Sequence, residues 1–235
     1  MRAAPSVELR SIIGRTRHLL LDFDGPICSI FAGLPAPTVA ARLRELLRSN
    51  TTPLPGSVAD EEDPIEVLRF TAGLDPNTAA LVETALRDAE RTAAKSATPT
   101  PDAREVILAC HQTGRRVAVI SNNSQAAIET YLRAHRLVEH VDVIVGRTDP
   151  DPRLLKPHPH LVLRALDALA GDPTTCAFVG DSTSDVQSAK AAGTQSVGYA
   201  NKPGKSERLH RAGADVIVAT MAELHAALLA YQPSS

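Results

Sequence analysis

The sequence predicts an α/β fold in which helices cover both faces of a parallel β-sheet, with an all-helical segment inserted. Two observations carry this prediction. From about residue 98 onward, apolar runs of strand length alternate with amphipathic segments, which is the pattern of parallel strands joined by helices. Residues 33–97 show helical patterns and no strand pattern. The chain has 235 residues, enough for one large domain or for a core with an insertion.

The first strand is expected at "HLLLDF", residues 18–23, after a short N-terminal helix. Its continuous apolar run fits a strand that is buried on both faces. Helices are expected throughout the inserted segment, and two of them begin with Asp followed by Pro, at Asp63 and Asp75. This pairing predicts an N-cap residue with proline at the first helical position. The stretch 96–101, "SATPTP", is then expected to be a linker.

Beyond this linker, helices and strands are expected in alternation. A helix should end at Gly114, the strand "RVAVI" should lead to Ser121, and Ser124 is the expected N-cap of the next helix. Residues 201–215 lack the spacing of a phosphate-binding loop and are not expected to bind a nucleotide. The remaining expected strands are "VDVIVG", "TCAFVG", "SVGYA" and "ADVIVA". Helices are expected after the first, second and fourth of these strands, and none is expected between "SVGYA" and "ADVIVA".

These patterns divide the chain into two expected domains. Residues 1–32 and 98–235 would form the α/β core, and residues 33–97 would form a helical domain. Between Ile27 and Thr98 there are seven Lys/Arg and ten Asp/Glu residues, so this domain is not expected to bind a polyanion. Its acidic run, residues 60–63, is expected to be a solvated helix start. Arg69 is expected on a helix surface, with a substrate anchor as the alternative.

Composition disfavours several classes of protein. The net charge is −2, Trp is absent and aromatic residues are few, so no nucleic-acid partner is expected. The three cysteines, Cys28, Cys110 and Cys176, are far apart, which disfavours a disulfide framework or a zinc site and favours a reducing compartment. The first 15 residues carry charges where a signal peptide has an apolar core. We therefore expect a cytoplasmic protein that has no membrane partner.

Polar residues follow successive predicted strands at the same end of the sheet, where open parallel sheets bind ligands. In chain order they are Asp22, Asp24, Ser121, Lys156, Asp181 and Asp185. Four carboxylates in one crevice need a cation, and oxygen donors without a His or Cys cluster indicate a hard ion, most simply Mg²⁺. Lys156 and the Ser121 hydroxyl can hold a phosphate beside that ion. Each motif alone is common in structural loops; their coincidence at one edge is what indicates a site.

The sequence resembles the haloacid dehalogenase-like hydrolase superfamily over nearly its whole length. The four family motifs appear in order as "LLLDFDGPI", "VAVISNN", Lys156 within "LLKPHP", and "FVGDSTSD". The resemblance implies a Rossmann-like core and a helical cap domain at residues 33–97, between the first and second motifs. One departure is Pro26, where the family usually has Thr, because proline lacks the N–H group and fixes φ.

The resemblance also implies roles for individual residues. Asp22 would be the nucleophile and Asp24 the general acid/base. The implied phosphate-binding residues are Ser121, Asn122 and Lys156. The implied Mg²⁺ ligands are Asp22, Asp24 (through its carbonyl), Asp181 and Asp185.

The expected function is Mg²⁺-dependent hydrolysis of a small organic phosphomonoester through an aspartyl-phosphate, in the layout of a phosphoglycolate phosphatase. A sugar phosphomutase would use the same residues and stays open. Dehalogenases and phosphonatases are disfavoured because they generally lack an acid at the position of Asp24. A non-catalytic binding domain is disfavoured because no site residue is missing. The expected partner is a small phosphorylated metabolite; the substrate and the choice between monomer and homodimer stay open.

Overall fold

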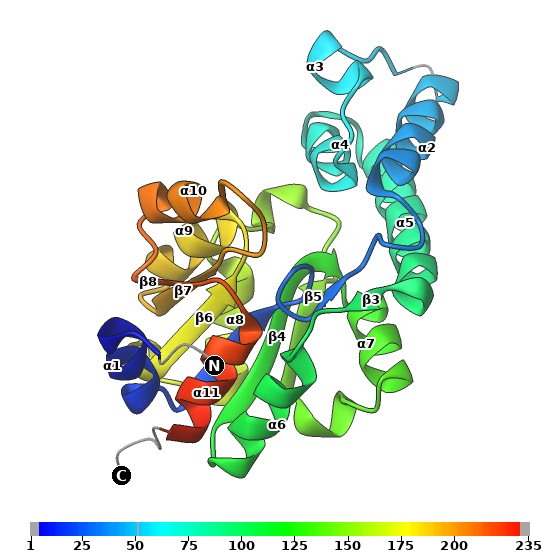
Figure 1. Ribbon diagram of the computed structural model, residues 1–235. Coiled ribbons are helices and arrows are strands. Elements are labelled where there is room, and N and C mark those ends of the chain that lie inside the picture. The colour runs from blue at the N-terminus through cyan, green and yellow to red at the C-terminus, as the bar shows by residue number, and fades with distance from the viewer. Residues whose placement is uncertain (1–4, 51, 231–235) are drawn as a thin grey trace.

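The computed structural model describes residues 5–50 and 52–230, and it consists of a parallel sheet between helices with a helical unit beside it (Figure 1). The expected α/β architecture is therefore confirmed. The ends of the expected core domain, residues 1–4 and 231–235, and residue 51 in the expected cap lie outside the described residues.

Six parallel strands form the sheet, in the spatial order β5-β4-β1-β6-β7-β8. Their bounds are β1 (His18–Asp22), β4 (Arg116–Ser124), β5 (Val143–Arg147), β6 (Cys176–Gly180), β7 (Gln195–Tyr199) and β8 (Val216–Val218). Strand β1 lies between β4 and β6 and is covered on both faces, which explains its continuous apolar run. The carboxyl ends of these three strands meet at one edge of the sheet.

Helices cover both faces of the sheet, and α1, α6, α7 and α11 share one apolar cluster while α8 and α9 share the other. The bounds of the seven helices around the sheet are α1 (Val7–Arg15), α6 (Ala103–Gln112), α7 (Gln125–Ala134), α8 (His160–Leu169), α9 (Thr183–Ala191), α10 (Lys205–Ala212) and α11 (Met221–Ala230). Three short 3₁₀ helices lie in the connections between helices and strands: η3 (Val138–His140), η4 (Pro152–Leu154) and η5 (Pro173–Thr175). Among the described residues, no helix has the length and apolar character needed to cross a bilayer.

Helix α10 is absent from the sequence prediction. It lies within residues 201–215, for which the sequence predicted no helix and no nucleotide binding. Its sequence, "KSERLHRA", is strongly polar, and Leu209 is its one buried residue. An apolar stripe is the main signal for a helix in sequence, and a single buried residue gives almost none.

The inserted segment forms a helical unit of its own (Figure 1). Its elements are α2 (Ala36–Ser49), α3 (Gly56–Ala59), α4 (Pro64–Phe70), η1 (Thr71–Gly73), α5 (Pro76–Ala93) and η2 (Ala94–Ser96). Helices α2, α4 and α5 share a third apolar cluster. Both predicted N-caps are confirmed, because Asp63 Oδ1 accepts a hydrogen bond from the Ile65 N–H (2.8 Å) and Asp75 Oδ1 accepts from the Asn77 N–H (3.0 Å).

The chain leaves the core and returns to it through one small ribbon. Strand β2 (Cys28–Ser29) pairs antiparallel with β3 (Thr98–Pro99), so the expected linker includes a two-residue strand. Next to it, the Thr100 hydroxyl donates to the Gly25 carbonyl at 2.6 Å, and the Thr100 N–H donates to the Ile27 carbonyl at 3.0 Å. The returning chain is thereby fixed to the loop that follows β1.

Strand β4 is longer than predicted and is interrupted near its end. Ile120 pairs with Val145, and Ser124 pairs with Arg147, so three residues of β4 lie opposite Gly146 alone. Residues 121–123 therefore bulge out of the ladder. Ser124 is the N-cap residue of α7, as predicted, although its side chain makes no capping hydrogen bond.

Candidate active site

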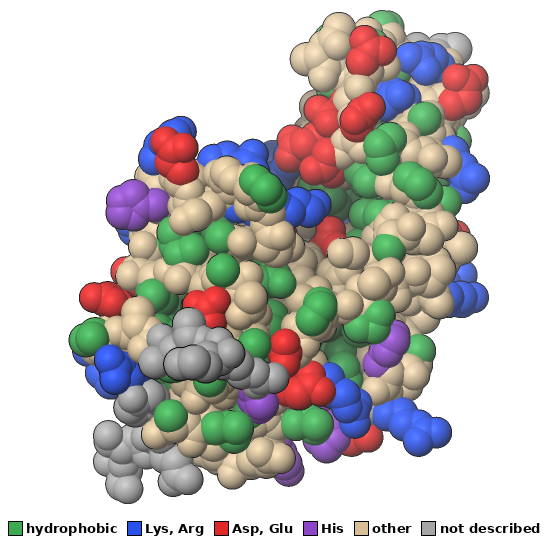
Figure 2. All heavy atoms as spheres, viewed as in Figure 1, with side chains coloured by type: hydrophobic (Ala, Val, Ile, Leu, Met, Phe, Trp, Pro, Cys, Tyr) green, Lys and Arg blue, Asp and Glu red, His purple; other side chains and the backbone are tan. Residues whose placement is uncertain are grey.

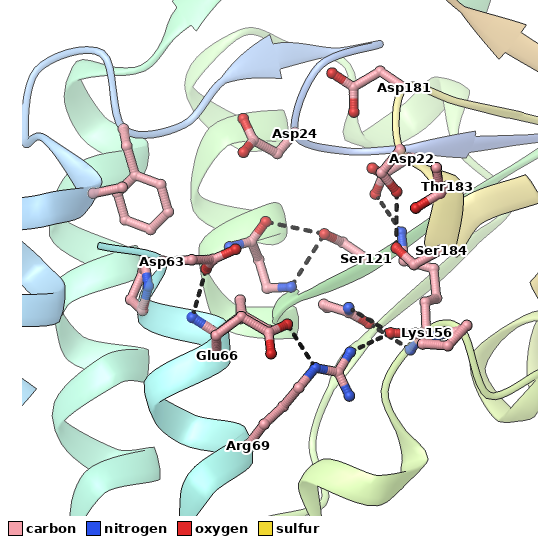
Figure 3. A pocket seen from close by; sticks show the side chains of 18 of the residues that line it. Asp22, Asp24, Asp63, Glu66, Arg69, Ser121, Lys156, Asp181, Thr183 and Ser184 are labelled. Carbon is pink, nitrogen blue, oxygen red and sulfur yellow. Dashed lines mark hydrogen bonds and ion pairs between the residues drawn. The ribbon is translucent and has the colours of Figure 1, made fainter. Parts of the chain in front are cut away.

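The predicted site residues surround one cleft of about 800 Å³ between the sheet edge and the helical unit (Figure 3). Six of them line it: Asp22, Asp24, Ser121, Asn122, Lys156 and Asp181. The seventh, Asp185, lies behind the lining, on the first turn of α9. The sheet topology explains the convergence, since β1, β4 and β6 are neighbours and end at the same edge.

Three acids form a compact group at the bottom of the cleft. Asp22, Asp181 and Asp185 each offer a carboxylate oxygen, and these oxygens lie within 4.8 Å of one another. Two glycines permit this approach. Gly25 has φ +110°, and a Cβ there would overlap the Asp181 carboxylate; a Cβ at Gly180 would overlap the Asp185 side chain.

Lys156 is the cation at the centre of this group. Its ammonium lies 2.8 Å from Asp22 Oδ1 and 2.6 Å from Asp185 Oδ1, and the side chain is 3% exposed. Burial opposes its charge, but the carboxylates of Asp185 and Asp22 outweigh burial and raise the pKa of Lys156 above its ordinary value. The lysine is therefore held in its charged form.

Asn122 supports Lys156 through its side-chain amide. Its Oδ1 accepts from the Lys156 N–H at 2.9 Å, and its Nδ2 donates to the Lys156 carbonyl at 3.3 Å. The structure thus gives this amide a role in holding the lysine loop. The phosphate contact expected for Asn122 stays a prediction.

The two acids that follow β1 have different surroundings. Burial raises the pKa of Asp22, the charge of Asp185 raises it further, and Lys156 opposes both. Asp24 stands apart from the three clustered acids and accepts a hydrogen bond from the Ile30 N–H at 3.0 Å. Burial raises the pKa of Asp24 to about 6, against the opposing effect of the Ile30 hydrogen bond. Asp24 can therefore exchange a proton near neutral pH.

Ser121 lies at the start of the bulge in β4. Its hydroxyl donates to Asn123 Oδ1 at 3.0 Å and accepts from the Asn123 N–H at 3.1 Å. The hydroxyl is thus held at the edge of the cleft by its own loop. In Figure 3 it lies between Lys156 and Asp24, as expected for a group that contacts a ligand bound there.

A second lysine at the site is absent from the sequence prediction. The Lys205 ammonium pairs with Asp181 Oδ2, and Asn201 Nδ2 lies 3.4 Å from the same oxygen. Burial raises the pKa of Asp181, and Lys205 opposes this shift. Both residues follow β7, so the rule that pointed to residues after β1, β4 and β6 could also have found them.

The helical unit contributes charged groups to the cleft, against expectation. Arg69 donates to the Lys156 carbonyl and, at 3.4 Å, to the Pro152 carbonyl, and it pairs with Glu66 at 2.9 Å. The prediction of a plain helix-surface arginine is wrong. The acidic run includes the N-cap of α4, as predicted, but Glu61, Glu62 and Asp63 also line the cleft. Figure 2 shows acidic side chains of the helical unit gathered above this hollow.

Comparison with known proteins identifies the family. The model of the family described as "Haloacid dehalogenase-like hydrolase" matches residues 62–199. The chain belongs to this hydrolase family. The resemblance noted from the four motifs is thereby confirmed.

Curated relatives of this haloacid dehalogenase-like hydrolase include two phosphoglycolate phosphatases. The protein from Salmonella paratyphi A is 30% identical over 128 residues, which are 54% of this chain and 50% of that protein. The match thus spans about half the length of this relative. The protein from Pectobacterium atrosepticum is 26% identical over 219 residues, covering 88% of this chain and 90% of that protein.

Solved structures share the fold at low identity. A predicted phosphatase from Clostridium acetobutylicum has a TM-score of 0.68 at 19% identity, with coverage of 92% of this chain and 99% of that one. The CbbY protein from Rhodobacter sphaeroides, solved in complex with phosphate, has a TM-score of 0.65 at 20% identity, covering 89% and 96%. At these identities the likeness establishes the fold.

Proposed function

We propose that this protein is a phosphatase that hydrolyses small organic phosphomonoesters with the help of a divalent cation, using Asp22 as its nucleophile. One observation carries the proposal: Asp22 ends the central strand, pairs with the buried Lys156 and faces the same cleft as Asp24 and Ser121. Two phosphoglycolate phosphatases among the relatives support the reaction class. The small substrate is inferred from the excess of acidic residues in the inserted segment, which does not favour a polyanion.

The acid cluster fits a hard dication such as Mg²⁺. Asp22 and Asp185 share the Lys156 ammonium and Asp181 pairs with Lys205, so the three clustered carboxylates outnumber the two lysines and leave excess negative charge. Oxygen donors without His or Cys suit Mg²⁺. Asp22, Asp181 and Asp185, with the carbonyl of Asp24, would hold it. When bound, such an ion stabilises negative charge on the phosphoryl oxygens.

The first step transfers the phosphoryl group to Asp22. A carboxylate oxygen of Asp22 attacks phosphorus, the bond from phosphorus to the ester oxygen breaks, and Asp24 donates its proton to that leaving oxygen. Lys156 orients Asp22 and favours its ionised form. Lys156 and Ser121 hold the phosphoryl oxygens in place, with the Ser121 hydroxyl turning its one proton from Asn123 Oδ1 to a phosphoryl oxygen.

The second step releases phosphate. Asp24, now a carboxylate, takes a proton from a water molecule as the water oxygen attacks phosphorus. The bond from phosphorus to Asp22 breaks, inorganic phosphate leaves, and both acids return to their starting states. The pKa of about 6 suits Asp24 to both roles, because an acid/base group works best when its pKa is near the operating pH.

The helical unit is proposed to act as a cap domain, residues 33–97, over a core of residues 1–32 and 98–235. The cleft lies between the two, and Arg69 reaches from α4 to the Lys156 loop. A cap in this place would exclude water and contact the leaving group. A cytoplasmic location is also proposed, since Cys28, Cys110 and Cys176 are all free thiols.

A substrate screen tests the proposal. Purified protein is assayed for phosphate release from a panel of alkyl, sugar and carboxylate-bearing phosphomonoesters, including 2-phosphoglycolate, with Mg²⁺ and with Asp22→Asn as the control. We expect Mg²⁺-dependent release that the variant lacks. Isomerisation of a sugar phosphate, dependent on a sugar bisphosphate and without net release, would instead identify a phosphomutase.

A further inference from the structure

We propose that a buried ion pair, Glu90 with Arg147, positions the phosphate-binding segment of this site. The segment is residues 121–124, and the pair joins it to helix α5 of the helical unit. Glu90 and Arg147 are positioning residues in this account and do not touch the substrate. The inference rests on the proposed function, because it assigns a purpose to the segment that holds phosphate.

Glu90 receives four hydrogen bonds in the protein interior, where its side chain is 0% exposed. Oε2 accepts from the Ser124 N–H at 2.8 Å and from Arg147 Nη2 at 2.9 Å. Oε1 accepts from Asn123 Nδ2 and from Arg147 Nη1, both at 3.1 Å. Each oxygen thus accepts two bonds, which is the full capacity of an ionised carboxylate.

These contacts continue to the Ser121 hydroxyl. Because a carboxylate can only accept, it fixes the amide of Asn123 with Nδ2 toward Glu90 and Oδ1 away from it. That Oδ1 accepts the Ser121 hydroxyl at 3.0 Å. The orientation of the Ser121 side chain therefore depends on a charge in α5 that lies outside the cleft lining.

Arg147 holds the backbone of the same segment from the other side. It ends β5, is 1% exposed at its side chain, and donates to the Asn122 carbonyl at 2.7 Å. Its partner in the sheet is Ser124, the first residue of β4 to pair again after the bulge. A Cβ at Gly146 would overlap the Gln125 backbone, so β5 approaches the end of the segment too closely for any side chain at position 146.

Stability alone is a weak reason for such a pair. The cost of burying two charges commonly cancels their attraction, and apolar replacements are often neutral or stabilising. The particular consequence of this pair is geometric. It fixes three residues that have left the sheet ladder, in the place where the site needs a preorganised anion-binding segment.

Glu83 provides a matched control within the same helix. It lies two turns earlier in α5, is buried, and also pairs with Arg147 (3.4 Å) and with Arg87 (3.0 Å). Glu83 has no hydrogen bond to residues 121–124 among the described contacts. Replacing either glutamate by glutamine removes one buried charge beside Arg147, but only Glu90→Gln places an NH₂ group against the donors of the segment.

The test measures binding of inorganic phosphate by calorimetry in the presence of Mg²⁺. Glu90→Gln should weaken phosphate binding by about 10- to 100-fold, the loss expected when one hydrogen bond to a charged ligand is no longer made. Glu83→Gln should stay within about twofold of wild type. Thermal melts compare the stability loss of the two variants. Arg147→Lys, which keeps the charge but loses the two-pronged contact, should also weaken phosphate binding.

A double-mutant cycle separates positioning from general destabilisation. If Glu90 acts through Asn123, the loss in Glu90→Gln/Asn123→Ala should be clearly smaller than the product of the two single losses. The inference would be overturned if the double-mutant loss equalled the product of the two single losses. Wild-type phosphate affinity in Glu90→Gln, or an equal loss of affinity in Glu83→Gln, would overturn it as well. If Glu90→Gln does not fold, wild-type phosphate affinity in Arg147→Lys overturns it. Phosphate binding without turnover in wild type would contradict the proposed phosphatase and leave this test intact.

Discussion

Replacing Asp24 by asparagine isolates its proposed role as acid and base. Asparagine keeps the shape and an oxygen that can accept the Ile30 hydrogen bond of 3.0 Å, so the loop after β1 should keep its position. The variant can neither donate a proton in the first step nor accept one in the second. Loss of a general acid/base typically lowers the rate by about 10²- to 10⁴-fold. We expect that loss with an alkyl phosphate, whose alkoxide leaves poorly without protonation.

The pKa of Asp24 sets the pH dependence of the same reaction. With a pKa of about 6, half of the Asp24 side chains are protonated at pH 6 and about one tenth at pH 7. Protonation is needed in the first step, so the rate with the alkyl phosphate should fall as pH rises above about 6, by up to tenfold per pH unit. An activated aryl phosphate needs little protonation and should show a flatter profile.

Steady-state kinetics from pH 5 to 8 with both esters measures these effects, in wild type and in Asp24→Asn. The variant should lose the pH dependence seen with the alkyl phosphate. Equal losses for the two esters, together with an unchanged pH profile in the variant, would refute the acid/base role and leave Asp24 as a structural or metal-site residue.

Three further predictions follow from the acid cluster. Exhaustive chelation should abolish turnover, with recovery on addition of Mg²⁺; full activity after chelation would refute the cation site. Gly180→Ala should lower turnover by at least tenfold while the sheet still folds, because its Cβ would displace Asp185; a crystal structure and kinetics check this. Lys156→Met should destabilise the metal-free protein by about 3–5 kcal/mol at pH 8, since buried carboxylates lose their counter-charge. Without Lys156 the folded-state pKa of Asp22 rises further. The loss in free energy of unfolding, measured by chemical denaturation, should therefore be smaller at pH 5, where protonation of Asp22 relieves the repulsion between the carboxylates.

Local chemistry explains why much of the site was predictable. Asp22, Ser121 and Asp181 each follow a strand with a strong apolar pattern, and parallel strands must present such residues at one edge. The helix starts at Asp63 and Asp75 were predictable because an N-cap followed by proline is a local signal. These predictions needed no knowledge of how distant segments pack.

Other features depend on tertiary packing and gave no local signal. Arg69 contacts the Lys156 carbonyl across 87 positions of sequence, and Glu90 contacts Arg147 across 57. In sequence, each of these residues is an ordinary charged position on a helix or at a strand end. Lys205 was missed because α10, which carries it, has a single buried residue and was not predicted; its place after β7 was the one signal that pointed to the site.

The most direct test of the account is to trap the phosphoenzyme. Asp24→Asn should slow the second step, so rapid acid quench after mixing with an aryl phosphate should capture a phosphorylated protein. Peptide mapping by mass spectrometry then locates the phosphoryl group. The account predicts it on Asp22, formed in a burst that matches the released phenol and is absent from the Asp22→Asn variant. A phosphoryl group on another residue, or normal turnover by Asp22→Asn, would contradict it.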